Sequence, residues 1–170
     1  LFAAGDLPGA GAALGNAMIS KSDVDHLRDT LVLKANVANR LRNFDELDAM
    51  ARDRVDAGSD PVAVVRIHGI HALSLFSRGE TSRAIEIFSE CVEAAERLGD
   101  TITHGKALGN LGFLLCQGHR IQDGIDALES SITSLRIANQ PVLAANFLNL
   151  LGRRLHEMGK MIEATEALQE

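Results

Sequence analysis

Apolar residues recur along this chain at helical spacing, in segments separated by short polar or glycine-containing turns. Ile85, Phe88, Val92 and Ala95, for example, follow an i, i+3, i+7, i+10 pattern that gathers apolar side chains on one helix face. Applied to the whole chain, the pattern predicts nine helices, over residues 6–19, 22–42, 44–57, 61–78, 80–98, 101–117, 119–138, 141–158 and 160–170.

Capping residues support these helix boundaries. Asp60 before Pro61 and Asp100 before Thr101 are typical of helix starts, because a short polar side chain can accept a hydrogen bond from a free backbone N–H. Gly99 is typical of a helix end. The predicted helices then pair into hairpins.

Small residues recur within the predicted helices at a nearly regular spacing of roughly forty positions. The first helices of successive hairpins carry Ala35, Ala72, Gly112 and Gly152. The second helices carry Ala10, Ala84, Gly124 and Ala164, and the equivalent position in the second copy is unclear. A glycine inside a helix costs about 1 kcal/mol relative to alanine. We therefore expect close helix crossings, of Gly112 with Gly124 and of Gly152 with Ala164.

These motifs resemble the tetratricopeptide repeat (TPR). Leu151-Gly152-x-x-Leu155, Gly159 and Ala164-x-x-x-Leu168 are similar to its LG-x-x-Y and A-x-x-x-F signature, as is Ala84-x-x-x-Phe88 for the second half. The resemblance implies an all-α fold, an α-α superhelix (solenoid) of antiparallel helical hairpins. The sequence departs from the family pattern because it lacks the usual tryptophan and tyrosine and because its repeat is longer.

The resemblance also implies a domain organisation. We expect one TPR-like solenoid segment over residues 1–170, taken from a longer chain, with a partial repeat at 1–20, repeats at 22–57, 61–98 and 101–138, and a truncated repeat at 141–170. Long repeats of this kind are similar to those of large bacterial transcription regulators of the LuxR and maltose-activator type and of antibiotic-regulatory activators.

Composition narrows the class of protein. The chain is 46% hydrophobic, lacks Trp and Tyr and has three Pro, which favours helices over a β-sandwich. Its net charge of −6 argues against a general nucleic-acid binder. Neither a signal-peptide pattern nor an apolar run of about 20 residues is present. Cys91 and Cys116 lack metal-type spacing, so we expect two reduced packing thiols in a cytoplasmic protein.

Candidate chemistry is weak by comparison. His68 and His71 lie three residues apart, with His104 in the next repeat, but no carboxylate or thiol shares their helical face. The stretch 105–109, GKALG, lacks the phosphate-loop pattern and a preceding strand. Ser130 and Ser131 have no base placed by a readable motif. We expect no enzyme, no metal site and no cofactor.

The concave side of the solenoid is the expected binding site, because such stacks generally bind partners there. The repeat phase assigns to it Asn36, Asn39, Arg40, Arg66, Leu73, Phe76, Lys106, Asn110, Phe113, Gln117, Asn146, Asn149, Arg153 and His156. Asparagines can hold a peptide backbone, Phe76 and Phe113 can hold an apolar group, and a strip of basic residues favours acidic partners. The acids expected on this side are chiefly Asp29 and Glu157.

Three functions are compatible with the sequence. The leading hypothesis is a non-catalytic scaffold that binds a protein or peptide, as the sensor or partner-binding region of a larger bacterial regulator, without direct contact to nucleic acid or membrane. The second is a structural stack that self-associates through exposed repeat ends. The third is a module that presents substrate to a catalytic domain outside this segment.

Overall fold

The computed structural model describes residues 21–52, 60–118 and 120–169, and within them it is all-α. These residues form eight helices: α2 (Lys21–Arg40), α3 (Phe44–Arg52), α4 (Pro61–Ser77), α5 (Thr81–Leu98), α6 (Thr101–Gln117), α7 (Ile121–Ile137), α8 (Pro141–Glu157) and α9 (Met161–Gln169). Each corresponds to a predicted helix, with ends that differ by at most two positions wherever both are described. The predicted helix at 6–19 and the end of the one at 44–57 lie outside the described residues.

Helix starts and ends follow the capping residues. The carboxylate of Asp60 accepts a hydrogen bond from the Val62 N–H at 3.0 Å, and that of Asp100 accepts one from the Thr103 N–H at 3.1 Å. Gly99 ends α5 in the left-handed region, at φ 67°. The local sequence is thus enough to set these boundaries.

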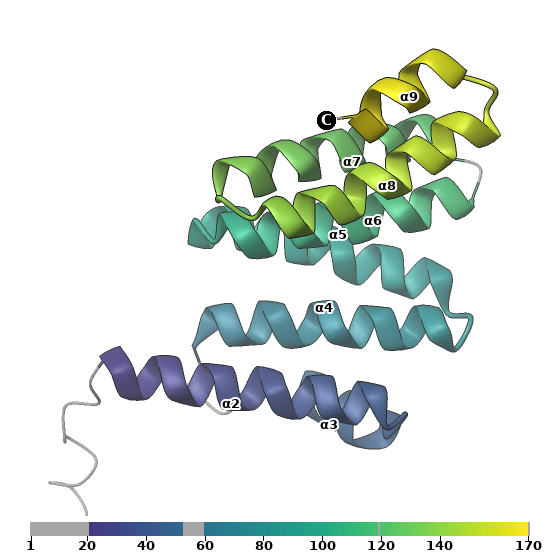
Figure 1. The fold of residues 1–170 in the computed structure, drawn as a ribbon. Coiled ribbons are helices and arrows are strands. Elements are labelled where there is room, and N and C mark those ends of the chain that lie inside the picture. The colour runs from purple at the N-terminus through teal and green to yellow at the C-terminus, as the bar shows by residue number, and fades with distance from the viewer. Residues whose placement is uncertain (1–20, 53–59, 119, 170) are drawn as a thin grey trace, which may run out of the picture.

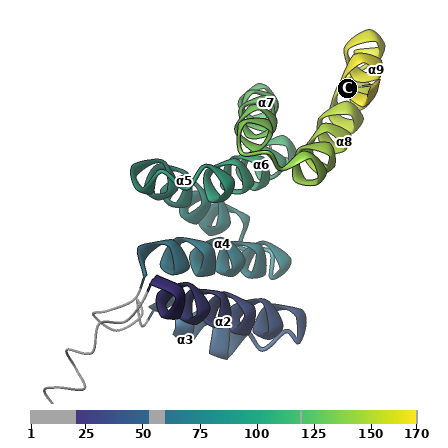
Figure 2. The same cartoon turned by 60° about the vertical axis from the view of Figure 1, so that its left-hand side comes forward.

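The helices form a stack of hairpins, α2–α3, α4–α5, α6–α7 and α8–α9 (Figures 1 and 2). Consecutive helices pack on one another, and the first helices of neighbouring hairpins also touch, α2 with α4, α4 with α6 and α6 with α8. The predicted solenoid of helical hairpins is therefore confirmed. The first helices share one side of the stack, and the residues predicted to bind a partner belong to these helices.

Large apolar side chains fill the interior of each described hairpin at equivalent positions of the repeat. Leu47, Phe88 and Leu128 lie on α3, α5 and α7, and each is 1% exposed or less. Leu47 belongs to the copy with the weakest sequence pattern, yet it packs with Ala35 and Ile70 as the pattern requires. Burial of such side chains stabilises each hairpin by about 2 kcal/mol per residue.

Glycine lets α6 approach its neighbours closely. A Cβ atom added at Gly112 would lie 2.7 Å from the carbonyl oxygen of Gly124, and one added at Gly124 would lie 2.5 Å from the Cys116 sulfur. The predicted crossing of these two glycines is confirmed. Gly109 meets the ring of Phe147 on α8, 2.3 Å from where its Cβ would be, a contact that the sequence did not indicate. Gly152 and Ala164 are both buried and line one cavity between α8 and α9.

These contacts predict opposite effects for two helix-interior glycines. Gly112→Ala places a methyl group against backbone that cannot move aside, so we expect the free energy of unfolding to fall by roughly 1–3 kcal/mol. Gly69→Ala is the matched control, because its Cβ would meet only Phe88 Cε1, at 3.9 Å. The better helix propensity of alanine should then raise stability by about 0.5–1 kcal/mol. Urea unfolding followed by circular dichroism measures the free energy of unfolding of both variants. If Gly112→Ala changed it by the same amount as Gly69→Ala, the close crossing would be contradicted.

Candidate binding site between the first helices

A cavity of about 360 Å³ opens between α4 and α6, with α2 at one end. We call it the α4–α6 cavity; it is lined by Val32, Asn36, Val65, Arg66, Gly69, Ile70, Leu73, Phe88, Cys91, Ile102, Thr103, Lys106, Ala107 and Asn110. Phe88 and Cys91 of α5 are 1% and 3% exposed, so they form its floor. Polar side chains of the first helices form its rim. The site therefore combines an apolar interior with hydrogen-bonding groups at the entrance.

Five of the fourteen residues predicted to bind a partner line this cavity. They come from three successive first helices and are Asn36, Arg66, Leu73, Lys106 and Asn110. The Asn36 amide donates to the Val32 carbonyl of its own helix at 2.9 Å, which leaves its side-chain oxygen as an acceptor. These five residues are far apart in the sequence, and the stacking of the first helices places them around one cavity.

Arg66 is held by an ion pair within the protein. Its guanidinium donates to Asp100 Oδ2 at 3.0 Å and to Thr103 Oγ1 at 3.1 Å. Although burial raises the pKa of the Asp100 carboxyl, hydrogen bonds from Thr103 and Arg66 hold that pKa below its usual range. The sequence analysis identified Asp100 only as a helix cap and missed its ion pair with Arg66, which largely neutralises the charge expected from Arg66.

The same ion pair recurs one repeat earlier. Arg28 on α2 pairs with Asp60, the N-cap of α4, just as Arg66 on α4 pairs with Asp100, the N-cap of α6. Each pair ties a first helix to the start of the next first helix. Two consecutive junctions of the stack are therefore joined by the same kind of ion pair, between an arginine of one first helix and the N-cap aspartate of the next.

The third junction lacks this ion pair. Forty positions after Arg66 and Asp100 stand Lys106 and Gln140, and glutamine carries no charge to pair with lysine. Lys106 is exposed, and it forms no ion pair within the described part of the chain. Its ammonium group is thus an unpaired cation on the rim of the α4–α6 cavity.

The other predicted residues lie apart from this cavity. Phe76 and Phe113 are half-buried and pack edge to face on each other, with ring centroids 5.6 Å apart. Arg153 and His156 line a second cavity, of about 320 Å³, between α8 and α9. Besides these two rings, five predicted residues lie outside both cavities: Asn39, which is half-buried, and Arg40, Gln117, Asn146 and Asn149, which are exposed.

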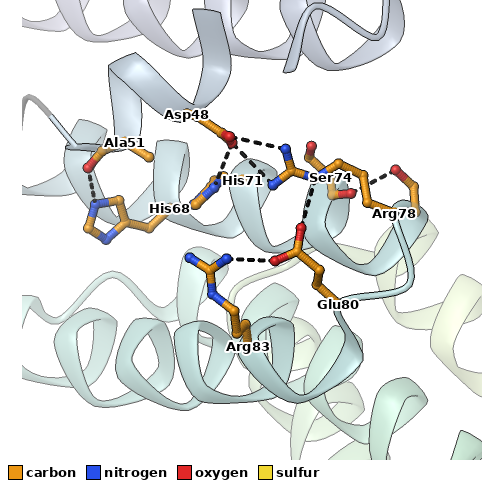
Figure 3. A network of polar contacts seen from close by, with 9 residues as sticks. Asp48, Ala51, His68, His71, Ser74, Arg78, Glu80 and Arg83 are labelled. Carbon is orange, nitrogen blue, oxygen red and sulfur yellow. Dashed lines mark hydrogen bonds and ion pairs between the residues drawn. The ribbon is translucent and has the colours of Figure 1, made fainter. Parts of the chain in front are cut away.

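His68 and His71 take part in packing between hairpins (Figure 3). Nε2 of His68 lies 3.2 Å from the Ala51 carbonyl oxygen, and Nε2 of His71 lies 3.0 Å from Asp48 Oδ1, both on α3. Burial lowers the pKa of His71, although the Asp48 carboxylate opposes this effect. The two histidines therefore join α4 to the preceding hairpin.

Arg78 completes this junction. It donates to both carboxylate oxygens of Asp48, at 3.0 and 3.3 Å, and its guanidinium lies over the Phe44 ring, 5.3 Å from the centroid. Nε of Arg78 lies 3.2 Å from Glu80 as an ion pair, without hydrogen-bond geometry. A polar network thus joins α3 to the α4–α5 hairpin beside the copy whose sequence pattern is weakest.

Both cysteines are free and buried. Burial raises the pKa of Cys91 to about 12 and also raises the pKa of Cys116, so both thiols are protonated near neutral pH. Among the described residues, no group of three or more His, Cys, Asp or Glu side chains gathers as a metal site would require. None of the described helices is long and apolar enough to cross a bilayer.

Fold and cavity together define a class, an all-α stack of helical hairpins with a cavity on the side of its first helices. The structure is similar to the crystal structure of BtubC (BKLC) from P. vanneervenii, with a TM-score of 0.70 at 13% sequence identity, over 95% of this chain and 68% of that one. At this identity the likeness shows the fold alone. No family model and no curated protein matches the sequence.

Asp100 should make stability depend on pH. Because its pKa is lowered on folding, its contribution is complete above the pKa of the unfolded chain, near 4, and is lost as the pH falls through the folded value. Asp100→Asn keeps a helix cap but loses the ion pair, so we expect about 1 kcal/mol lower stability at pH 7.

This stability gap should close toward pH 2, as measured by urea unfolding of both proteins at several pH values. Asp123→Asn, at an exposed i, i+3 ion pair with Arg120, is the control, with an expected change under about 0.5 kcal/mol. A gap that does not change with pH would contradict the role given to the carboxylate.

Proposed function

We propose that this chain is a non-catalytic scaffold that binds an acidic peptide segment of a partner in the α4–α6 cavity. The observation that carries the proposal is that five residues assigned to binding by the repeat phase line one cavity. In this role the chain is the partner-binding region of a larger cytoplasmic bacterial regulator. The resemblance of its long repeats to those of such regulators supports that setting.

The charges around the cavity support an acidic partner. The overall charge of the chain is −6, yet Lys106 stands unpaired on the cavity rim within the described structure. Asn36 and Asn110, from α2 and α6, supply amide groups that can hydrogen-bond a peptide backbone. A carboxylate beside Lys106 restores the charge pairing that Asp60 and Asp100 provide at the two preceding junctions. Charge complementarity of this kind favours specificity and rapid association.

Selection from a random heptapeptide display library tests the proposal directly. The unaltered chain should enrich peptides that carry Asp or Glu, and their affinity should fall with rising salt. Lys106→Glu should weaken these peptides about five- to tenfold, because an exposed ion pair contributes on the order of 1 kcal/mol and the substitution adds repulsion. Fluorescence anisotropy of synthetic copies of the selected peptides measures the change.

Lys160→Glu is the matched control for this experiment. Lys160 precedes α9, pairs with Glu163 and lies outside the cavity, so its reversal should leave affinity unchanged. Two outcomes would overturn the proposal: no peptide enriched above an uncoated surface, or equal affinity of the selected peptides for the unaltered chain and Lys106→Glu.

The outer face of α2 favours a second candidate function, a stack that self-associates. Leu33 and Val37 of α2, and Leu41 directly after its end, are 64%, 46% and 74% exposed and follow one stripe at helical spacing. One repeat after Leu33 and Val37, the equivalent positions on α4 are Ile70 and Ser74, which are 9% and 0% exposed. On α4 this face is buried in the stack, whereas on α2 no described residue covers it, and in this candidate function a second copy does.

Sedimentation velocity over a range of concentrations tests this candidate. Self-association predicts a sedimentation coefficient that rises with concentration, and Leu33→Glu with Leu41→Glu should abolish the rise, because charged side chains on the stripe oppose burial. Val142→Glu, at a side chain 74% exposed on α8, serves as control. A monomer at every concentration rules the second candidate out.

A further inference from the structure

Gly69 has no packing role that explains its place inside α4. A Cβ added there would meet only Phe88 Cε1, at 3.9 Å, an ordinary van der Waals contact. At Gly105, Gly109 and Gly112 of α6, by contrast, an added Cβ would come within 2.3 to 2.8 Å of a neighbour. A helix-interior glycine destabilises a helix relative to alanine. Helix packing requires the α6 glycines and does not require Gly69.

What Gly69 does instead is leave space in the α4–α6 cavity. It lines the cavity directly above the buried ring of Phe88, and Ile70 and Leu73 of the same helix line it as well. Any side chain larger than hydrogen at this position enters the cavity and reduces its volume. The room above Phe88 therefore exists because residue 69 is glycine.

The chemistry of this space selects its occupant. Its floor and walls are apolar, and the Cys91 thiol in the floor is uncharged because burial raises its pKa to about 12. Arg66 donates hydrogen bonds to Thr103 and Asp100, and the Thr103 hydroxyl donates one to Asp100. A volume of about 360 Å³ is at the small end of ligand cavities. These features fit one aliphatic side chain better than a charged group or a large cofactor.

We propose that Gly69 is the specificity-determining residue of the cavity, and that it admits one aliphatic side chain of the bound peptide over Phe88 while a neighbouring acidic residue pairs with Lys106. The inference rests on the proposed peptide-binding function and specifies the ligand further. The peptide carries an aliphatic residue close to an Asp or Glu. The acidic residue gives charge complementarity at the rim, and the aliphatic one fills the interior.

Substitutions of increasing size at Gly69 test the inference with the peptides selected on the unaltered chain. Gly69→Ala should raise Tm and weaken binding about two- to fivefold, because the methyl group takes part of the space. Gly69→Leu should weaken binding more than about tenfold. Ser130→Leu, at an exposed position of α7 outside the cavity, is the matched small-to-large control and should leave affinity unchanged.

A second selection on Gly69→Leu gives an independent measurement. Peptides enriched by this variant should keep the acidic position and lose the aliphatic one. Where Gly69→Leu fails to fold, Gly69→Ala decides, because its Tm shows that the fold is intact. Unchanged affinity of a folded Gly69 variant overturns the inference.

The outcomes also separate this inference from the function on which it rests. An acidic consensus without an aliphatic position, from the unaltered chain, removes the role of Gly69 and leaves peptide binding in place. The absence of any enriched peptide removes both. The inference and the proposed function are both supported if the unaltered chain selects an acidic and an aliphatic position and Gly69→Leu no longer selects the aliphatic one.

Discussion

Close contact between α6 and its neighbours positions the described stack from α4 to α9. Gly105, Gly109 and Gly112 follow i, i+4, i+7 spacing, so they form one face of α6, and that face meets α7 and α8 at distances where a Cβ has no room. The Ser131 hydroxyl of α7 donates to the Gly105 carbonyl at 2.6 Å, which fixes the two helices along their axes. Because a packed helix cannot rotate, Lys106 is held at the cavity rim.

The junctions between hairpins show that one repeat position serves stability at two of them and, in the proposed function, binding at the third. Arg28 and Arg66 each pair with the aspartate that caps the next first helix, so two positive charges are used within the fold. At the third junction the equivalent residues are Lys106 and Gln140, the neutral N-cap of α8, and Lys106 forms no ion pair within the described part of the chain. A partly exposed ion pair contributes only about 0–1 kcal/mol, so its loss at one junction is tolerable in a stack held together by apolar burial.

The sequence predicted those features that depend on local or periodic information. Helix boundaries follow from caps such as Asp100, and the crossing of Gly112 with Gly124 follows from the repeat spacing. The ion pair of Arg66 with Asp100 could not be predicted in this way, because it joins residues on different hairpins whose facing depends on how the two hairpins dock. The same holds for the edge-to-face contact between the rings of Phe76 and Phe113, which also lie on different hairpins.

The glycines show where prediction from the sequence ends. Gly69 and Gly109 lie in helices of equal length and at the same repeat position, so the repeat pattern treats them alike. The difference comes from the following hairpin, because the ring of Phe147 on α8 fills the space at Gly109, whereas no equivalent ring reaches Gly69. The residue one repeat before Phe147 is Ala107 on α6, and its methyl group cannot supply that ring. A glycine whose space another helix fills lets the helices pack closely, and one left uncovered on the side of the first helices leaves a cavity there.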